Sequence, residues 1–380
     1  MNERIYLDFN ASTPVDPGVA AAMSPFLTET YGNPSSLHWA GLPARDAVET
    51  ARSQVASLLA CDATEVIFTS GGTEANNQAI KGLFFARRPS GSSFHMITSR
   101  IEHPAVLEPC RFLESQGAEV TRLPVDGRGL VAPDDVRRAI RPHTALISIM
   151  HANNEVGTIQ PLETIAAIAR EHGIPCHSDA AQTVGKIPVD VESLGLDLLS
   201  VAGHKLYGPK GVGVLYVREG LELEPLLHGA GHEAGRRAGT ENILEIIGLG
   251  AACELAESWV DDSTVVELRD HFWQMLRAHF GDEVVLNGHP EQRLPNTLNV
   301  SFRGHVGSEL LARMPNISAS TGSACHAGAA QISPVLEAMA VPRDVGLGTV
   351  RFSLGRSTTR AEIDCVIDTL VRSCNFSVLE

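Results

Sequence analysis

The chain has 380 residues, of which 43% are hydrophobic and 20% are charged, a composition that is typical of folded globular proteins and excludes a disordered chain. Its 30 basic and 45 acidic side chains give a formal charge of −15, so no excess of positive charge is available to neutralise a nucleic-acid backbone. No apolar run approaches the ~20 residues that cross a bilayer, and neither a nucleic acid nor a membrane is expected as a partner.

The chain start and the cysteine pattern both bear on where the protein works. Residues 1–4 lack the charged-then-apolar pattern of a signal peptide and the Arg/Ser-rich pattern of a transit segment. The seven cysteines are scattered and include no Cys-x-x-Cys pair, so they predict neither a zinc site nor a disulfide framework. We therefore expect a cytoplasmic protein without a bound metal.

Short apolar runs alternate with longer amphipathic segments from about residue 14 to residue 226. The runs, which we predict to be buried strands, are 65–69, 94–98, 144–150, 174–178, 197–201 and 211–217. Between them, helices are predicted over residues 45–59, 73–87, 104–116 and 162–172. This alternation predicts an α/β fold whose mostly parallel sheet carries helices on both faces.

The pattern changes near residues 256–264. After it we predict a helix at 265–280, a strand at 296–302, a mobile small-residue loop at 318–331, a strand at 350–353 and a closing helix at 360–374. We therefore predict two domains: a large α/β domain over residues 15–257, and a smaller α+β domain formed by residues 1–14 together with residues 258–380.

Two familiar nucleotide-binding motifs are absent. Gly229 and Gly231 are followed by the next glycine only at residue 235, which does not match Gly-x-Gly-x-x-Gly. The segment 203–208 is followed by Pro209 and is not a Walker loop. Nicotinamide or nucleotide chemistry is therefore disfavoured.

Three other signals follow predicted strands, at the sheet edge where ligands of open α/β sheets bind. Gly72 and Thr73 open a helix whose backbone N–H groups suit a phosphate, Asp179 follows the run 174–178, and Lys205 follows the run 197–201. Singly, each has a plain structural reading, as a capped helix, a salt-bridge partner or a solvated lysine. Together they match pyridoxal phosphate, whose aldehyde needs an amine, whose ring nitrogen needs an acid and whose phosphate needs an anion site.

A set of short motifs makes the prediction more specific. They lie at residues 6–14, 32–36, 68–77, 102–103, 153–157, 178–182, 203–209, 237–242, 322–326 and 350–356. In this order, over essentially the whole chain, they resemble the cysteine desulfurases and the closely related selenocysteine lyases, pyridoxal-phosphate enzymes of the class-V aminotransferase group. The resemblance implies pyridoxal-phosphate fold-type I and a homodimer.

The resemblance also implies roles for individual residues around the cofactor ring. Lys205 would bind the cofactor aldehyde as a Schiff base and later move protons to and from the substrate. Asp179 would pair with the ring nitrogen, and Gln182 and Asn154 would hydrogen-bond the phenolic oxygen. His103 would stack on the ring and act as an acid or base.

The phosphate and the substrate have their own predicted residues. By resemblance, the phosphate would be bound by Gly72, Thr73 and His204, and by Thr240 of a second subunit. Ala202 stands where related enzymes commonly have a phosphate-binding serine. Arg351 would bind the substrate carboxylate, for which a bidentate guanidinium is well suited, and Asn33 would help to position that group.

Cys325 is the predicted nucleophile. It lies among Gly, Ser, Ala and His residues, where packing is poor and access is good, and His326 or a nearby cation would help to form the thiolate. By resemblance, Cys325 would take sulfur from L-cysteine as a persulfide, releasing L-alanine, and would pass it to an acceptor such as an iron–sulfur scaffold, a tRNA-thiolation protein or a free thiol.

Three alternatives stay open from the sequence. His326 and the segments 333–336 and 355–362 resemble animal selenocysteine lyases, which act on L-selenocysteine. An ordinary aminotransferase or another lyase of this fold would not need Cys325. A non-catalytic sulfur-relay scaffold would use the fold only for docking.

Overall fold

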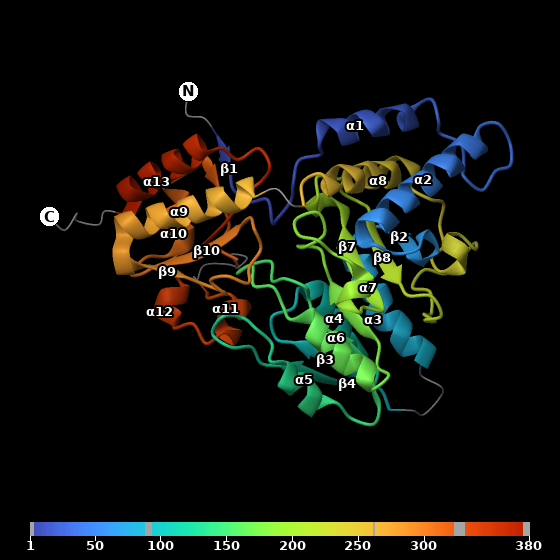
Figure 1. Ribbon diagram of the computed structural model, residues 1–380, viewed down its shortest axis with the longest axis horizontal. Coiled ribbons are helices and arrows are strands. Elements are labelled where there is room, and N and C mark those ends of the chain that lie inside the picture. Colours follow the sequence, from blue (N-terminus) through green and yellow to red (C-terminus); the bar gives the residue numbers. More distant parts are fainter. Residues whose placement is uncertain (1–3, 88–92, 261–262, 323–330, 375–380) are drawn as a thin grey trace.

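The computed structural model describes residues 4–87, 93–260, 263–322 and 331–374. Its larger sheet has seven strands in the order β2-β8-β7-β6-β5-β3-β4 (Figure 1). The strands are β2 (Val66–Thr69), β3 (His95–Ser99), β4 (Glu119–Leu123), β5 (Thr144–Ser148), β6 (Cys176–Asp179), β7 (Leu198–Ala202) and β8 (Gly213–Val217). Strand β8 is antiparallel to both of its neighbours, and all other pairings are parallel.

Helices cover both faces of this sheet, because its strands are apolar on both sides. Adjacent residues such as Met96 and Ile97, or Leu146 and Ile147, point to opposite faces and join different apolar clusters. One face carries α2 (Gly41–Leu59), α5 (Pro133–Ala139), α6 (Leu162–Glu171), α7 (Val191–Leu194) and α8 (Ile243–Glu257). The other carries α3 (Gly72–Arg87) and α4 (Pro104–Ser115). The predicted α/β class, mostly parallel with helices on both faces, is confirmed.

A second, antiparallel sheet has the order β12-β10-β9. It consists of β9 (Val284–Leu286), β10 (Thr297–Phe302) and β12 (Thr349–Ser353), and shares an apolar core with α9 (Thr264–Phe280), α10 (Gly307–Ala312) and α13 (Arg360–Cys374). The short helices α11 (Pro334–Ala338) and α12 (Arg343–Gly346) complete this part.

The N-terminal segment belongs to this second core. Strand β1 (Ile5–Tyr6) pairs in parallel with β11 (Ile317–Ser318), and in Figure 1 it lies beside α13. Leu7 is fully buried in the same apolar cluster as β10 and β12. The segment after it, residues 8–11, contacts Arg351 of β12 and Lys205 after β7, and so touches both parts of the molecule. The exact domain boundaries at residues 14 and 257 stay a prediction.

Most predicted elements lie within a few residues of the observed ones, with two instructive omissions. Helix α8 was not predicted, because its apolar residues are spread around the helix and show no amphipathic period. It packs against α2 and α1 (Pro17–Met23) above the sheet (Figure 1). Strand β4 was not predicted either, because it is a partly exposed edge strand with polar and charged residues. Residues 323–330 of the predicted loop lie outside the described residues.

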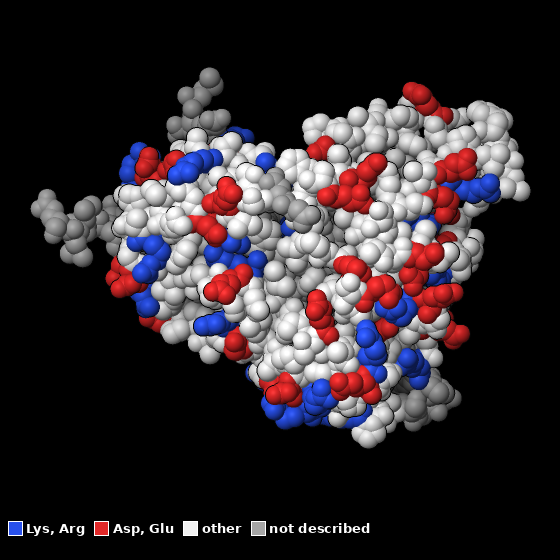
Figure 2. Space-filling view, viewed as in Figure 1, with Lys and Arg blue, Asp and Glu red and all other residues white. Residues whose placement is uncertain are grey.

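Two surface observations bear on partners. None of the helices in the described part of the chain has the length and apolarity that crossing a membrane requires. Figure 2 shows acidic and basic side chains interspersed over both parts of the face it presents, in keeping with the chain's formal charge of −15.

Candidate active site

The predicted cofactor residues follow strands that share one edge of the seven-stranded sheet. Gly72 follows β2, His103 follows β3, Asn154 follows β5, Asp179 ends β6, and Lys205 follows β7. Because these strands run in the same direction, their carboxyl ends meet at that edge. The topology thus brings together residues that are spread over more than a hundred positions of sequence.

Asp179 is a buried carboxylate with a fixed orientation. It is 7% exposed, its Oδ2 accepts a hydrogen bond from Asn76 Nδ2 at 2.7 Å, and its Oδ1 accepts one from the Ala181 N–H at 3.0 Å. Asn76 lies on α3 and is itself buried, and its Oδ1 has no partner in the described part of the chain. Sequence reasoning missed Asn76, which supports Asp179 from the neighbouring helix.

Lys205 presents a largely buried amine whose pKa is lowered. Its Nζ donates to the backbone oxygens of Asn10 and Ala11, the latter at 2.9 Å. Burial, followed by the nearby Arg351 guanidinium, lowers the pKa of Lys205 to about 8, although Asp179 and Asp8 act in the opposite direction. An amine with that pKa is partly unprotonated near neutral pH and can attack an aldehyde.

His103 caps the helix that follows β3. Its Nδ1 accepts a hydrogen bond from the Ala105 N–H at 3.1 Å, so in the neutral ring the proton is on Nε2. The residue is exposed toward the sheet edge, yet the protein around its ring lowers the pKa of His103; Asp179 opposes this effect and Lys205 adds to it. A neutral histidine at this place can stack on a ring and exchange a proton.

The start of α3 forms an open anion site. The N–H groups of Gly72, Thr73 and Glu74 donate to no acceptor in the described part of the chain, and α3 is 16 residues long. Such free donors at a helix start suit a phosphate. An ideal Cβ on Gly72 would stand 3.2 Å from the Ala202 Cβ, so Ala202 lies directly against this turn.

His204 lies near the same edge of the sheet. Its Nδ1 is 3.4 Å from Ser12 Oγ, and burial, with Lys205 and Lys210 nearby, lowers the pKa of His204 to about 4. It is therefore neutral at physiological pH and would meet a phosphate as a hydrogen-bond donor rather than as a cation.

Gln182 belongs to the same cluster. It is buried, its Nε2 donates to the Asn10 backbone oxygen at 3.0 Å, and its Oε1 accepts from Lys186 Nζ at 2.8 Å. Lys205 donates to the same oxygen of Asn10. Gln182 and Lys205 therefore converge on one carbonyl group of the N-terminal segment.

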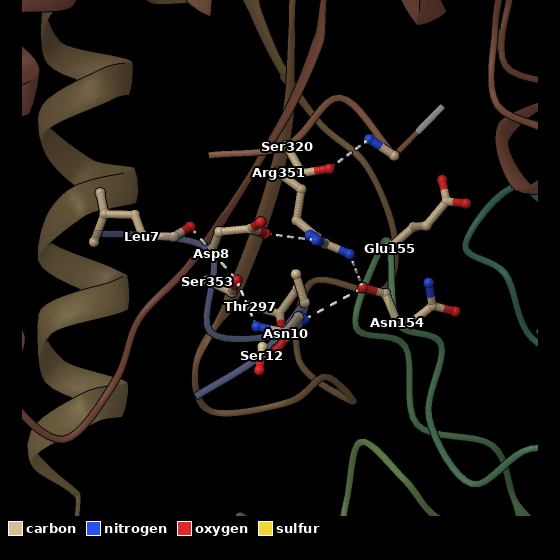
Figure 3. A network of polar contacts seen from close by, with 12 residues as sticks. Leu7, Asp8, Asn10, Ser12, Asn154, Glu155, Thr297, Ser320, Arg351 and Ser353 are labelled. Atoms are coloured by element: carbon tan, nitrogen blue, oxygen red, sulfur yellow. Dashed lines mark hydrogen bonds and ion pairs between the residues drawn. The ribbon is translucent and has the colours of Figure 1, made fainter. Parts of the chain in front are cut away.

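Arg351, in the middle of β12, is held by two oxygens (Figure 3). Its Nη2 lies 2.7 Å from Asp8 Oδ1, and its Nη1 donates to the Asn154 backbone oxygen at 2.8 Å. The side chain is almost fully buried, and its Nε has no partner among the described residues. The guanidinium is thus fixed in place and keeps free donors for a carboxylate.

Two predicted residues lie apart from this cluster. Asn33 is exposed in the loop before α2, where its Oδ1 accepts from the Ser35 N–H at 2.9 Å. Thr240 is exposed in the segment before α8. Within the described residues, no contact joins either of them to Lys205 or Arg351. Cys325 and His326 lie outside the described residues, and their roles stay predictions.

Two further buried polar residues were missed from the sequence. The Glu102 carboxylate accepts hydrogen bonds from Ser99 Oγ at 2.6 Å and from the Met150 N–H at 3.0 Å, and burial raises the pKa of Glu102 to about 8. Asn10 accepts hydrogen bonds from two amines: its side-chain oxygen accepts one from Lys186 Nζ, and its backbone oxygen accepts one from Lys205 Nζ. Burial of a polar residue is not readable from sequence, so neither could be singled out.

The described residues fit pyridoxal phosphate. Lys205 supplies an amine of lowered pKa, Asp179 a buried oriented acid, and the start of α3 free N–H donors. These are the three groups that the aldehyde, the ring nitrogen and the phosphate require. No cluster of three or more His, Cys, Asp or Glu side chains suited to a metal occurs in the described part of the chain.

Comparisons with known proteins agree with this site. The model of the family described as aminotransferase class-V matches residues 5–366. A protein named cysteine desulfurase IscS, from Dictyoglomus turgidum, is 49% identical over 376 residues, which cover 98% of this chain and 95% of that protein.

Two solved structures are similar over nearly the whole chain. A structure titled NifS-like protein matches with a TM-score of 0.91 and 37% identity, covering 97% of this chain and 98% of the other. A structure titled SspA in complex with cysteine matches with a TM-score of 0.82 and 40% identity, covering 92% of this chain and 98% of the other.

Proposed function

Because this chain belongs to the aminotransferase class-V family, we propose that it is a pyridoxal-phosphate-dependent cysteine desulfurase, which converts L-cysteine to L-alanine. The observation that carries the proposal is that the amine of Lys205 and the guanidinium of Arg351 both contact residues 8–11 of the N-terminal segment. Lys205 Nζ contacts the Asn10 oxygen, and Arg351 Nη2 contacts Asp8, two residues earlier. The first suits an aldehyde and the second a carboxylate, the two ends of an amino acid bound through such a cofactor.

The surroundings of several side chains indicate their chemical roles. Pyridoxal phosphate, when bound, supplies a ring that withdraws electrons from the substrate α-carbon. Asp179 would keep the ring nitrogen protonated, and the free N–H groups at the start of α3 would bind the phosphate. Lys205 Nζ, with a pKa of about 8, would accept a proton from the α-carbon and return it near neutral pH.

The sulfur would leave the substrate by transfer to Cys325. The Cys325 thiolate would form a bond to the substrate sulfur as the carbon–sulfur bond breaks, and the carbon fragment would take a proton to become alanine. The bound sulfur becomes a persulfide, so no external oxidant is required. A sulfur-acceptor protein or a free thiol would then remove it, and a role in iron–sulfur cluster biosynthesis is the corresponding biological proposal.

An exposed apolar cluster supports the proposed homodimer. Leu27, Tyr31, Leu37 and Trp39, in the segment between α1 and α2, are 63%, 66%, 79% and 80% exposed. Large apolar side chains gathered on one segment are typical of a surface that another chain covers. Light scattering of the purified protein should give twice the chain mass, and Trp39→Glu should shift it toward the monomer.

The proposed function is tested with L-cysteine and L-selenocysteine side by side. Wild-type holoenzyme should form alanine from L-cysteine, and Lys205→Ala should lose both turnover and the visible absorption of the bound cofactor. Alanine formation from L-selenocysteine alone would instead support a selenocysteine lyase. A wild-type chain that binds no pyridoxal phosphate would contradict either enzyme.

A further inference from the structure

A second lysine amine lies at the cofactor edge of the sheet. Lys186 Nζ donates to Gln182 Oε1 at 2.8 Å and to Asn10 Oδ1 at 3.0 Å. Within the described residues it forms no ion pair with a carboxylate. Part of the side chain reaches solvent, but burial of the amine, followed by the charges of Lys205 and Arg351, holds the pKa of Lys186 well below its usual range.

The two hydrogen bonds persist whether or not this amine is charged. An ammonium has three N–H donors and a neutral amine still has two, and both acceptors here are carboxamide oxygens. A buried amine without an acidic partner is costly unless its hydrogen bonds are satisfied. Lys186 therefore supplies its neighbours with a pair of fixed donors in either protonation state.

Those donors fix the direction of the Gln182 carboxamide. A carboxamide has an accepting end and a donating end, and a donor facing Oε1 turns Nε2 the other way. Nε2 has two hydrogens, of which one reaches the Asn10 backbone oxygen at 3.0 Å. Lys205 Nζ also donates to that oxygen, so Gln182 Nε2 and the Lys205 amine meet at one carbonyl group, and the second hydrogen of Nε2 is not used by it.

The chemistry of pyridoxal phosphate gives this hydrogen a partner. Its phenolic oxygen is on the ring carbon next to the one that carries the aldehyde, so the oxygen lies near any amine that binds the aldehyde. A donor beside the ionised oxygen stabilises it, whereas a carbonyl oxygen there would destabilise it. The direction of the Gln182 carboxamide therefore decides the sign of its effect.

We propose that Lys186 is a positioning residue, which locks the Gln182 carboxamide with an N–H toward the phenolic oxygen of the cofactor. Through Asn10 Oδ1 it fixes a second carboxamide, whose Nδ2 donates to Thr297 Oγ1 at 2.8 Å and to the Asn154 backbone oxygen at 3.3 Å. This inference rests on the proposed function, because it requires pyridoxal phosphate on Lys205.

The test is a double-mutant cycle on the holoenzyme, with the pH midpoint of the visible absorption band of the bound cofactor as the readout. Lys186→Met should raise the midpoint by about half to one pH unit, because the ionised phenolic oxygen loses an oriented donor and its neighbouring nitrogen holds a proton more tightly. Gln182→Ala should raise it similarly. In the Gln182→Ala background, Lys186→Met should add little.

The cycle separates positioning from charge. Lys205, Arg351, Asp179 and His103 also face the site and stay in place in every variant. If Lys186→Met shifts the midpoint as much in the Gln182→Ala background as in the wild type, Lys186 acts through its charge. If Lys186→Met leaves the midpoint unchanged, Lys186 orients nothing. Either result overturns the inference.

Two controls complete the experiment. Lys81→Met removes a lysine of α3 whose amine lies over the Phe112 ring of α4, away from this network, and should leave the midpoint unchanged. If Lys186→Met does not fold, Lys186→Gln, which keeps a shorter donor, should shift the midpoint in the same direction, and no shift would again overturn the inference. A wild-type protein without a visible band would refute the proposed function, whereas a wild-type band with an unmoved variant would refute this inference alone.

Discussion

Arg351 and Asp8 are 343 residues apart in sequence, yet Arg351 Nη2 and Asp8 Oδ1 are 2.7 Å apart (Figure 3). The pair joins the antiparallel sheet to the N-terminal segment. Two residues further along, the same segment contacts Lys205 of the large sheet. The candidate site is thus assembled from both ends of the chain, with residues 8–11 as the link.

Asp8→Asn is expected to raise the KM for L-cysteine by about tenfold with a small change in kcat, because the guanidinium loses a charged partner that holds it in place. Steady-state kinetics at saturating pyridoxal phosphate measure both constants. A lower KM would show instead that Asp8 competes with the substrate carboxylate. The matched control is Glu362→Gln, which changes a partly exposed carboxylate on α13 whose hydrogen bonds are with Thr359.

Asn76→Ala is expected to weaken cofactor binding about tenfold, because Asp179 loses a buried hydrogen-bond donor at 2.7 Å. Cofactor affinity is measured by equilibrium dialysis of the apoprotein. Asn77→Ala, on the same helix, removes only a hydrogen bond to the Thr73 backbone oxygen and should have a much smaller effect. Equal affinities for the Asn76 variant and the wild type would contradict the role of Asn76.

The rate at which the apoprotein takes up pyridoxal phosphate should rise with pH through about 8, because in the proposed function the neutral amine of Lys205 attacks the cofactor aldehyde. The Arg351 cation lowers the pKa of Lys205, so Arg351→Gln should raise that pKa and move the profile to higher pH. Stopped-flow absorbance between pH 6 and 10 gives both profiles. A profile unmoved by Arg351→Gln would show that burial alone sets this pKa.

Burial raises the pKa of Glu102 to about 8, above the usual range for a glutamate in an unfolded chain. Its protonated form is favoured by the fold, so the stability it contributes is complete below about pH 4 and is lost as the pH rises toward 8. Glu102→Gln cannot ionise and should show a smaller fall in melting temperature between pH 5 and 8. Parallel pH profiles for the variant and the wild type would contradict this assignment.

The sequence located the residues whose position follows from strand direction alone. Asp179 and Lys205 each come directly after an apolar run, and parallel strands place such residues at a common edge. The residues that support them were not found. Lys186 and Asn10 are 176 positions apart, and nothing local in either segment indicates that they touch.

The same distinction explains the missed elements. A helix with one apolar face shows a period in its sequence, but the apolar residues of α8 are spread around the helix, which packs against α2 and α1 and leaves Glu254 and Glu257 exposed. The hydrogen bonds of Asp8 and Asn76 depend on how separate segments pack, which is a property of the folded chain rather than of any window of residues.

A single turnover of holoenzyme with one equivalent of L-cysteine, followed by mass spectrometry of the peptide that contains Cys325, tests the proposed sulfur transfer most directly. One mole of alanine per mole of added sulfur and one additional sulfur atom on Cys325 are expected. Cys325→Ser should give no such product and should retain the visible band of the bound cofactor. Alanine and sulfide released by Cys325→Ser at the wild-type rate would contradict the proposed transfer.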